Sequence, residues 1–416
     1  MRRRSFLEGL AAPAAFAGPD RAAVITALGG QPLEQLRDFH KRELAAEYIA
    51  LWDRSGIDRQ YGGVFPEDNQ EGDPRRNTDK EMYYQARALW VFSYIYNHFE
   101  PHPRHLETAR RTRDFLVGHC REGEARWISR FTRDGRRLQG SFNIYGDIYM
   151  IQGLAEYGQA ASAKEDLDLA VATAYGVMER VVSPSYQHLD SHGSSHEPGT
   201  KRLGTWQHFL GALTPLLRRK EEPGVANIAR MCVRNILERH WRPELGVAFE
   251  HLDDRFEPFR PDPLEGHRLV SGWHSVQGAW MSMDEGLRLG HRKMFLDGLE
   301  MGRLTLEKCW ADGRQFSGLV NLDSPEARPR EPGSLLAAPS GAIDDALVFG
   351  LMAAEHTGAA WAMRWYDRAF AAGYRHPENW KRRCLLHHPR RLLLSIEILD
   401  RMIARGGRVS DFLDRA

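Results

Sequence analysis

Helical periodicity is the feature that most restricts how this chain of 416 residues can fold. From Pro32 onward, apolar residues recur at helical spacing in about twelve long stretches, which predicts six pairs of amphipathic helices. Breakers such as Gly56 and Gly373 stand at several of their ends. The predicted helices cover roughly residues 32–54, 79–99, 103–120, 143–160, 164–182, 201–219, 223–240, 271–290, 292–310, 342–356, 358–373 and 388–405.

Short aromatic segments separate alternate helix pairs. Each is partly alternating and has a turn nearby, which predicts small hairpins at a repeated place in the chain. These segments are 61–65, 126–131, 246–251 and 315–319. Six helix pairs with hairpins at one end predict an all-α fold, an (α/α)6 barrel, whose short β-hairpins lie at the cleft end. An open helical solenoid is the alternative, but it leaves a long concave surface with no evident ligand.

The first 30 residues differ from the rest of the chain. The paired arginines of segment 1–7, followed by an alanine-rich stretch, resemble a twin-arginine export signal, and segment 15–17 fits a small-residue cleavage site. We therefore expect residues 1–30 to form a tail or signal, residues 31–410 to form one barrel domain, and the protein to be exported to the periplasm. A disordered basic tail on a cytoplasmic protein is the alternative.

The amino-acid composition limits the classes of binding partner that we expect. The 57 Lys and Arg residues balance the 56 Asp and Glu residues, so a nucleic-acid partner is not expected. No apolar run approaches the roughly 20 residues that a bilayer span needs, so no membrane partner is expected. The four cysteines form no CxxC pair and there is no HExxH motif. The loop with His192 and His196 is a weak metal candidate, and we expect no metal site.

Two histidines stand in settings suited to proton transfer. His274 shares a helix face with Gln277, and Trp273 shares one with Trp280. His387 lies just ahead of a His-Pro pair, which suits the first turn of a helix. The positive end of a helix lowers the pKa of an imidazole, and a neutral imidazole is a usable general base. A histidine packed in the core and a solvated basic helix end are the simpler alternatives.

An arginine and a third histidine complete the candidate catalytic set. Arg87 lies on an aromatic helix stripe with Tyr83, where a charge is costly unless it is paired or bound to an anion. Such an arginine can stabilise an oxyanion on a substrate, and a structural ion pair is the alternative. His208 follows Trp206 at the start of another predicted helix.

Taken together, these motifs resemble the N-acylglucosamine 2-epimerase family, which includes cellobiose 2-epimerases and mannose-type aldose–ketose isomerases. The resemblance covers nearly the whole chain from about residue 33. It implies an (α/α)6 barrel, in agreement with the helix count. The segments that carry it are 61–65, 85–90, 144–157, 273–280 and 387–390.

The resemblance implies catalytic roles for four residues. His274 and His387 match the two family histidines, one of which removes the C2 proton of an open-chain aldose to give an enediolate while the other returns a proton. His208 matches a third histidine that assists ring opening, and Arg87 matches an arginine that stabilises the enediolate. No cofactor is implied, because the adjacent carbonyl acidifies the C2 proton.

The chain also departs from the family pattern. Gln277 stands where the family has a glutamate, so it can orient His274 but supplies no charge. Asp345 lies near a family acidic position, in place of a missing Trp-Trp-Pro stretch, and Trp380 lies two residues too far from His387. The expected substrate-binding residues are Gln277, Trp273, Trp206, Tyr83, Trp380 and Asp345.

The expected function is therefore 2-epimerisation of a small carbohydrate. An isomerase would return the proton at C1 instead. A glycan hydrolase or lyase on the same fold is a rival class, because two carboxylates at the right separation would suffice. An inactive sugar-binding protein is a further alternative, and a homodimer is one assembly open to the chain. The hydrolase candidates are Asp147, Glu250, Asp344 and Asp345.

Overall fold

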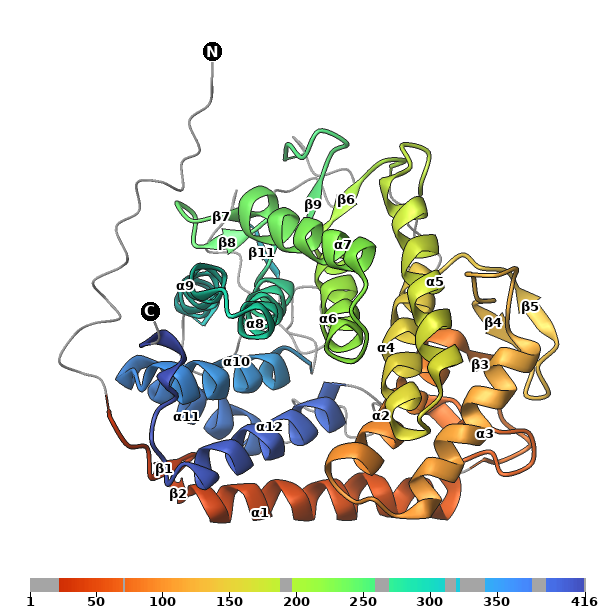
Figure 1. Cartoon of the computed structure of the whole chain (residues 1–416), viewed down its shortest axis with the longest axis horizontal. Coiled ribbons are helices and arrows are strands. Elements are labelled where there is room, and N and C mark those ends of the chain that lie inside the picture. Colours follow the sequence, from red (N-terminus) through yellow and green to blue (C-terminus); the bar gives the residue numbers. More distant parts are fainter. Residues whose placement is uncertain are drawn as a thin grey trace.

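Twelve α-helices in two concentric layers make up most of the part of the chain that the computed structural model describes (Figure 1). The described residues are 22–69, 72–187, 197–258, 269–310, 319–321, 341–375 and 387–414. Trp380 and the loop with His192 and His196 therefore lie outside them. The helix bounds agree with the periodicity to within a few residues, and the predicted (α/α)6 barrel is confirmed.

Six helices form the inner layer, and each contacts the next around a closed ring, with the last contacting the first. Most of their residues are buried, as expected of helices enclosed by neighbours. In the fifth of them every residue is buried. The inner helices are α2 (Met82–His98), α4 (Ile144–Ala160), α6 (Leu203–Arg219), α8 (Gly272–Leu289), α10 (Gly341–Thr357) and α12 (His387–Ala404).

The outer helices cover this ring. Each packs on the inner helix that precedes it, and the first packs on α12, so the two ends of the ring lie side by side (Figure 1). Two of them continue into wider helical turns, at Leu44–Ile49 with Trp52–Gly56, and at Asn235–His240. The outer helices are α1 (Leu33–Glu43), α3 (Pro103–His119), α5 (Lys164–Val182), α7 (Pro223–Arg234), α9 (Arg292–Cys309) and α11 (Ala360–Arg375).

Short antiparallel strands mark the end of the barrel at which inner helices begin. β3 (Lys80–Glu81), β6 (Lys201–Arg202) and β10 (Leu269–Ser271) each lead directly into an inner helix. They pair with β4 (Arg130–Phe131), β9 (His251–Leu252) and β11 (Leu319–Asn321), and β4 also pairs with β5 (Arg137–Gln139). The remaining pairs are β7 (Trp241–Arg242) with β8 (Val247–Ala248) and β1 (Ala27–Leu28) with β2 (Gln31–Pro32).

Most of the predicted hairpin segments contribute strands, and one does not. Segments 126–131 and 246–251 supply β4, β8 and β9, and the described end of 315–319 lies in β11. Segment 61–65 forms only an isolated bridge between Ile57 and Val64. The reason is local, because Gly62 and Gly63 adopt φ angles of 94° and 75°, which turn the chain instead of extending it.

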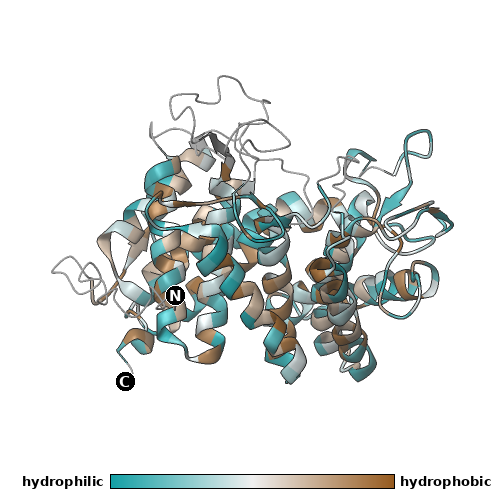
Figure 2. Cartoon of the chain, turned by 90° about the horizontal axis from the view of Figure 1, so that it is seen from above, coloured by the Kyte–Doolittle hydropathy of each residue, from teal (hydrophilic) through white to brown (hydrophobic). Residues whose placement is uncertain are grey.

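At the opposite end of the barrel, short turns connect each inner helix except α12 to the outer helix that follows it. Segments 99–102, 161–163, 220–222, 290–291 and 358–359 connect inner to outer helices there. In Figure 2 the longer connections gather toward one end of the helices and the short turns toward the other. The two mouths of the barrel therefore differ, and side chains from the strand-bearing connections can reach only one of them.

The N-terminal boundary expected at residue 30 does not coincide with a structural boundary. Ile25 is 2% exposed, and its backbone nitrogen donates to the Gly407 carbonyl at 2.8 Å. Residues 22–30 are thus tied to the C-terminal segment, and residues 1–21, with the predicted signal, lie outside the described part. Among the helices that the structure describes, none is both long and apolar enough to cross a membrane.

A buried polar network closes the ring. His388 at the start of α12 lies 3.0 Å from Asp344 of α10 and 2.9 Å from Glu43 of α1. Arg391 donates to Asp344 at 3.2 Å and lies 3.7 Å from Glu43, which also accepts from Tyr374 of α11. Burial alone would raise the pKa of Glu43, but His388 and Arg391 lower it to about 2. Four helices are therefore joined by fully compensated charges.

Replacing Arg391 with methionine should destabilise the fold by about 3–5 kcal/mol, because Glu43 and Asp344 lose a buried cation while they stay enclosed. Urea unfolding followed by circular dichroism measures this. The matched control is Arg303→Met, since Arg303 pairs with Glu300 and Glu307 on the exposed face of α9. That change should cost less than about 1 kcal/mol. Equal losses in both variants would contradict a structural role for the network.

Candidate active site

Four of the predicted catalytic side chains come together at the strand-bearing mouth. They come from four inner helices: Arg87 from α2, His208 from α6, His274 from α8 and His387 from α12. The imidazole centroids of His208 and His274 are 5.9 Å apart. The Trp273 indole lies 5.0 Å from the His274 ring and 5.1 Å from the His387 ring, centroid to centroid. One small molecule could therefore contact all three histidines.

His274 is oriented by a carboxylate from a different part of the chain. Its Nδ1 lies 2.7 Å from Glu250, between β8 and β9, and Arg202 of β6 donates to the same carboxylate at 3.0 Å. Burial would raise the pKa of Glu250, but His274 and Arg202 hold it well below its usual range. Glu250 is thus an anion that fixes a proton on Nδ1, which leaves Nε2 of His274 as the atom that can exchange protons.

His208 has its tautomer fixed by the backbone. Its Nδ1 lies 2.6 Å from the Gly204 carbonyl, which can only accept, so Nδ1 carries the proton and Nε2 is a free base. Burial, followed by the charges of His274, Arg390 and Arg87, lowers the pKa of His208 well below its usual value. A Cβ at Gly204 would lie 3.0 Å from the His274 ring, so glycine permits this close approach.

His387 lies at the start of an inner helix, where its surroundings favour the neutral imidazole. It is the first residue of α12, next to the positive end of the helix. Burial lowers its pKa well below 6.5, and the nearby Arg390 and Arg87 guanidinium groups lower it further. Gly341 makes room for it, since a Cβ there would lie 2.7 Å from His387 and 3.0 Å from Trp273.

Arg87 is held between two aromatic rings on the wall of the site. Its guanidinium lies 3.5 Å from the Tyr83 ring centroid and 4.4 Å from that of Tyr149, and it donates to the Tyr149 hydroxyl at 3.0 Å. Arg87 is 2% exposed. Its charge therefore sits in a low-dielectric environment, where it acts strongly on a neighbouring anion.

Asp345 holds neighbouring side chains of the site in place, and its carboxylate accepts hydrogen bonds from them. It is fully buried and accepts from Trp273 at 2.7 Å, Trp280 at 3.0 Å and Arg390 at 2.6 Å. Burial raises its pKa, although these donors oppose the shift. Protein donors contact both of its oxygens, and the expected contact of Asp345 with substrate stays a prediction. Asp345 acts through Trp273, which contacts both His274 and His387.

Two further predictions need correction. Gln277 was expected to orient His274, but Glu250 does so, and the Gln277 oxygen turned toward α12 accepts from both terminal nitrogens of Arg390 at 2.9 Å. Trp206 was expected to bind substrate, but it is 2% exposed and belongs to the apolar core. Residues two apart on a helix point in opposite directions, so Trp206 faces away when His208 faces the site.

Sequence reasoning missed the partners of the predicted residues. Glu250 was considered only as a hydrolase carboxylate, since nothing in a separation of 24 residues links it to His274. Arg390 stood in a quoted motif without a role. Among the described residues, no cluster of three or more His, Cys, Asp or Glu side chains could hold a metal ion. The expectation that no cofactor is needed stays a prediction.

Comparison with known proteins gives a consistent picture. The family model described as N-acylglucosamine 2-epimerase (GlcNAc 2-epimerase) matches residues 63–381. The chain is 20% identical over 305 residues to the cellobiose 2-epimerase of Dictyoglomus turgidum, covering 70% of this chain and 75% of that one. The solved cellobiose 2-epimerase of Spirochaeta thermophila superposes with a TM-score of 0.70 at 18% identity, over 89% of this chain and 98% of that one. A D-mannose isomerase structure gives a TM-score of 0.68 at 13% identity, over 88% and 98%.

Gly341→Ala should displace His387 or Trp273, because the new Cβ would overlap both. We expect ring movements approaching 1 Å in a crystal structure and a loss of turnover of about 100-fold. Gly118→Ala is the control, since a Cβ on that helical glycine of α3 meets no atom within 4 Å. Unmoved rings in the Gly341 variant would show that the site tolerates a side chain there.

Proposed function

The chain belongs to the N-acylglucosamine 2-epimerase family of sugar isomerases, and on that premise we propose that it interconverts C2 epimers of an aldose by histidine-mediated proton transfer. The observation that carries this proposal is the convergence of three imidazoles from three inner helices beside the buried Arg87. Proton abstraction next to a carbonyl needs bases that are neutral near pH 7 and a cation for the enediolate oxygen.

His387 serves as the base that removes the C2 proton. Its lowered pKa keeps the imidazole neutral, and the start of α12 together with Arg390 and Arg87 surrounds it with positive charge. Positive surroundings lower the basicity of the His387 imidazole. They also stabilise the enediolate that forms when the proton leaves, so the same groups favour the transition state.

His274 serves as the acid that returns a proton to the opposite face. The Glu250 carboxylate lies 2.7 Å from Nδ1 and engages that nitrogen, so Nε2 is the atom left to exchange a proton with the sugar. The guanidinium groups of Arg390 and Arg87 act on His387, and the Asp345 carboxylate lies 3.9 Å from its Nδ1. His274 instead has the Glu250 carboxylate 2.7 Å from its Nδ1. The two imidazoles therefore differ in their hydrogen-bond partners, as the two different roles in one proton relay across C2 require.

His208 and Arg87 assist these steps. Free Nε2 of His208 can accept the hydroxyl proton when the sugar ring opens, because Nδ1 is committed to the Gly204 carbonyl. Arg87, held by Tyr83 and Tyr149, stabilises the enediolate oxygen. Asp345 holds Trp273 against both imidazoles and so keeps them in place.

Aldose–ketose isomerisation is the second candidate, because it begins with the same C2 deprotonation and differs only in returning the proton at C1. Similarity to a D-mannose isomerase structure is compatible with it. Glycan hydrolysis fits less well, since all four carboxylates considered for it are engaged by protein cations. Asp147 pairs with Arg180, Glu250 with Arg202 and His274, Asp344 with His388 and Arg391, and Asp345 with Arg390.

Incubation with glucose, mannose, N-acetylglucosamine and cellobiose in D2O, followed by NMR, tests the reaction. We expect at least one of these aldoses to exchange its C2 hydrogen and to yield its epimer. Absence of exchange with every sugar would overturn the proposal, and deuterium at C1 of a ketose would assign the isomerase outcome.

His387→Asn should lower the epimerisation rate by about 10²–10⁴-fold. His274 remains in this variant, so one epimer should still exchange its C2 hydrogen slowly while the other does not. The control is His119→Asn, because that histidine is exposed at the end of outer helix α3 and should leave the rate unchanged. Full epimerisation by the His387 variant would exclude it as a base.

The pH profile should reveal the neutral base. His387 is inactive only when protonated, and its pKa is lowered, so the acidic limb of kcat/KM should lie clearly below pH 6.5. Activity should persist as the pH falls through 6.5 and disappear only at lower pH. A limb at or above pH 6.5 would mean that another group is the base.

A further inference from the structure

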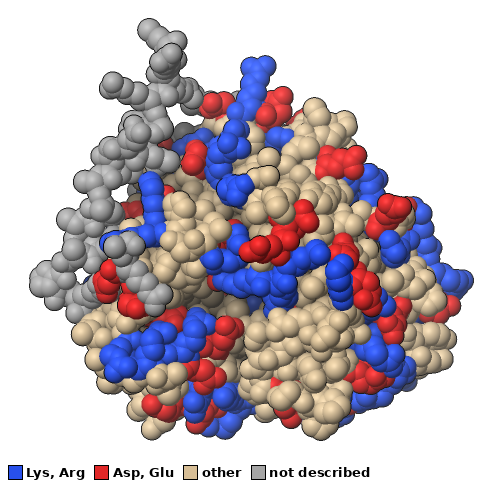
Figure 3. Space-filling view, viewed as in Figure 1, with Lys and Arg blue, Asp and Glu red and all other residues tan. Residues whose placement is uncertain are grey.

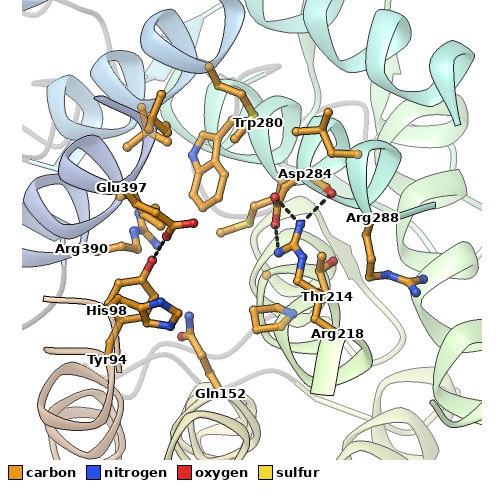
Figure 4. Close-up of a pocket in the computed structure, with 18 of the residues that line it drawn as sticks. Tyr94, His98, Gln152, Thr214, Arg218, Trp280, Asp284, Arg288, Arg390 and Glu397 are labelled. Atoms are coloured by element: carbon orange, nitrogen blue, oxygen red, sulfur yellow. Dashed lines mark hydrogen bonds and ion pairs between the residues drawn. The ribbon is translucent and has the colours of Figure 1, made fainter. Parts of the chain in front are cut away.

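The inner helices also enclose a cavity of about 410 Å³ on the side away from the strands (Figure 4). We call it the far cavity, since it is lined mainly by the C-terminal halves of all six inner helices. Trp280 and Arg390 form its wall toward the active site, because both also donate to Asp345. The volume lies within the usual range of about 300–1,000 Å³ for small-molecule sites.

An aromatic column runs along one wall of the far cavity. Trp90, Tyr94 and His98 lie one helical turn apart on α2, with ring centroids 4.9 Å and then 4.3 Å apart. The Trp280 indole faces the cavity from α8 (Figure 4). Aromatic faces of this kind pack against the apolar faces of pyranose rings.

The charges around the far cavity are mutually compensated. Its five arginines each have a carboxylate partner, so none offers an uncompensated positive charge to an anion. Acidic and basic side chains are likewise interspersed over the face seen in Figure 3. The pairs are Arg218 with Asp284, Arg219 with Glu156, Arg288 with Glu285, Arg390 with Asp345, and Arg401 with Glu355.

Several polar groups in the far cavity suit hydroxyl ligands. The Gln152 amide projects into the space (Figure 4). The Nε atoms of Arg219 and Arg390 are buried without a hydrogen-bond partner in the described part of the chain. Buried polar atoms are normally satisfied, and a ligand hydroxyl or an ordered water would satisfy these two.

We propose that the far cavity binds a neutral mono- or disaccharide as a second carbohydrate site, distinct from the site of C2 chemistry. The aromatic column takes the apolar face of a sugar ring, and Gln152 with the two guanidinium groups binds its hydroxyls. Compensated charges exclude a phosphorylated or carboxylated ligand. The site is independent of the proposed function, because none of the three histidines lines it.

Calorimetric titration of the full-length protein with glucose, mannose and cellobiose tests this site, together with crystals soaked in the same sugars. We expect a sugar between Tyr94 and Trp280 in the crystals. Gln152→Met should weaken binding there about tenfold, the effect of losing one or two hydrogen bonds. The matched control is Gln159→Met, two turns along the same helix α4 and exposed, which should leave binding unchanged. His387→Asn should also retain this binding.

Two results would overturn the proposal. One is an empty far cavity in the soaked crystals, or binding that Gln152→Met and Gln159→Met leave equally strong. The other is tighter binding of glucose 6-phosphate than of glucose, which would assign an anion site. Sugar in the far cavity of a protein that exchanges no C2 hydrogen would support this inference and overturn only the proposed function.

Discussion

Two adjacent buried carboxylates at the start of α10 hold both the ring and the site together. Asp344 and Asp345 are almost fully enclosed, and a buried carboxylate is tolerated only when cations and hydrogen-bond donors compensate it. Asp344 reaches His388 and Arg391, and through them Glu43, so it joins the last inner helix to the first outer one. Asp345 takes its donors from α8 and α12 and thereby fixes the wall of the site.

The direction of the inner helices explains why the chemistry lies at one mouth. His208, His274 and His387 all stand in or near the first turns of their helices, where unpaired backbone N–H groups add positive potential. Together with Arg87 and Arg390, this environment lowers the pKa of His208 and His387 and favours a developing enediolate. His274 differs from the other two histidines because the Glu250 carboxylate lies beside it. Glu250 belongs to the connection between β8 and β9 and not to a helix.

The opposite mouth has the same helices but a different electrostatic character. There the arginines and carboxylates neutralise one another, and aromatic rings supply much of the apolar wall. Trp280 and Arg390 belong to both halves, since each lines the far cavity and donates to Asp345. Trp280 and Arg390 therefore separate the far cavity from the active site, and Asp345 holds both of them in place. The two mouths of the barrel can each contact a sugar through different groups.

The sequence by itself determined the helices, because the 3.6-residue period is a local property of each segment. It also singled out His208, His274, His387 and Arg87 from their motifs. The tertiary structure alone decided their partners. Glu250 pairs with His274 because Phe249 bridges to Val270 of β10, the strand that leads into α8, and not because of any spacing between the two residues. Gln277 turns to Arg390 for the same kind of reason. Asp345 is a positioning group because donors from neighbouring helices satisfy its oxygens. Trp206 is a core residue because neighbouring helices bury its ring. No local sequence pattern contains that information.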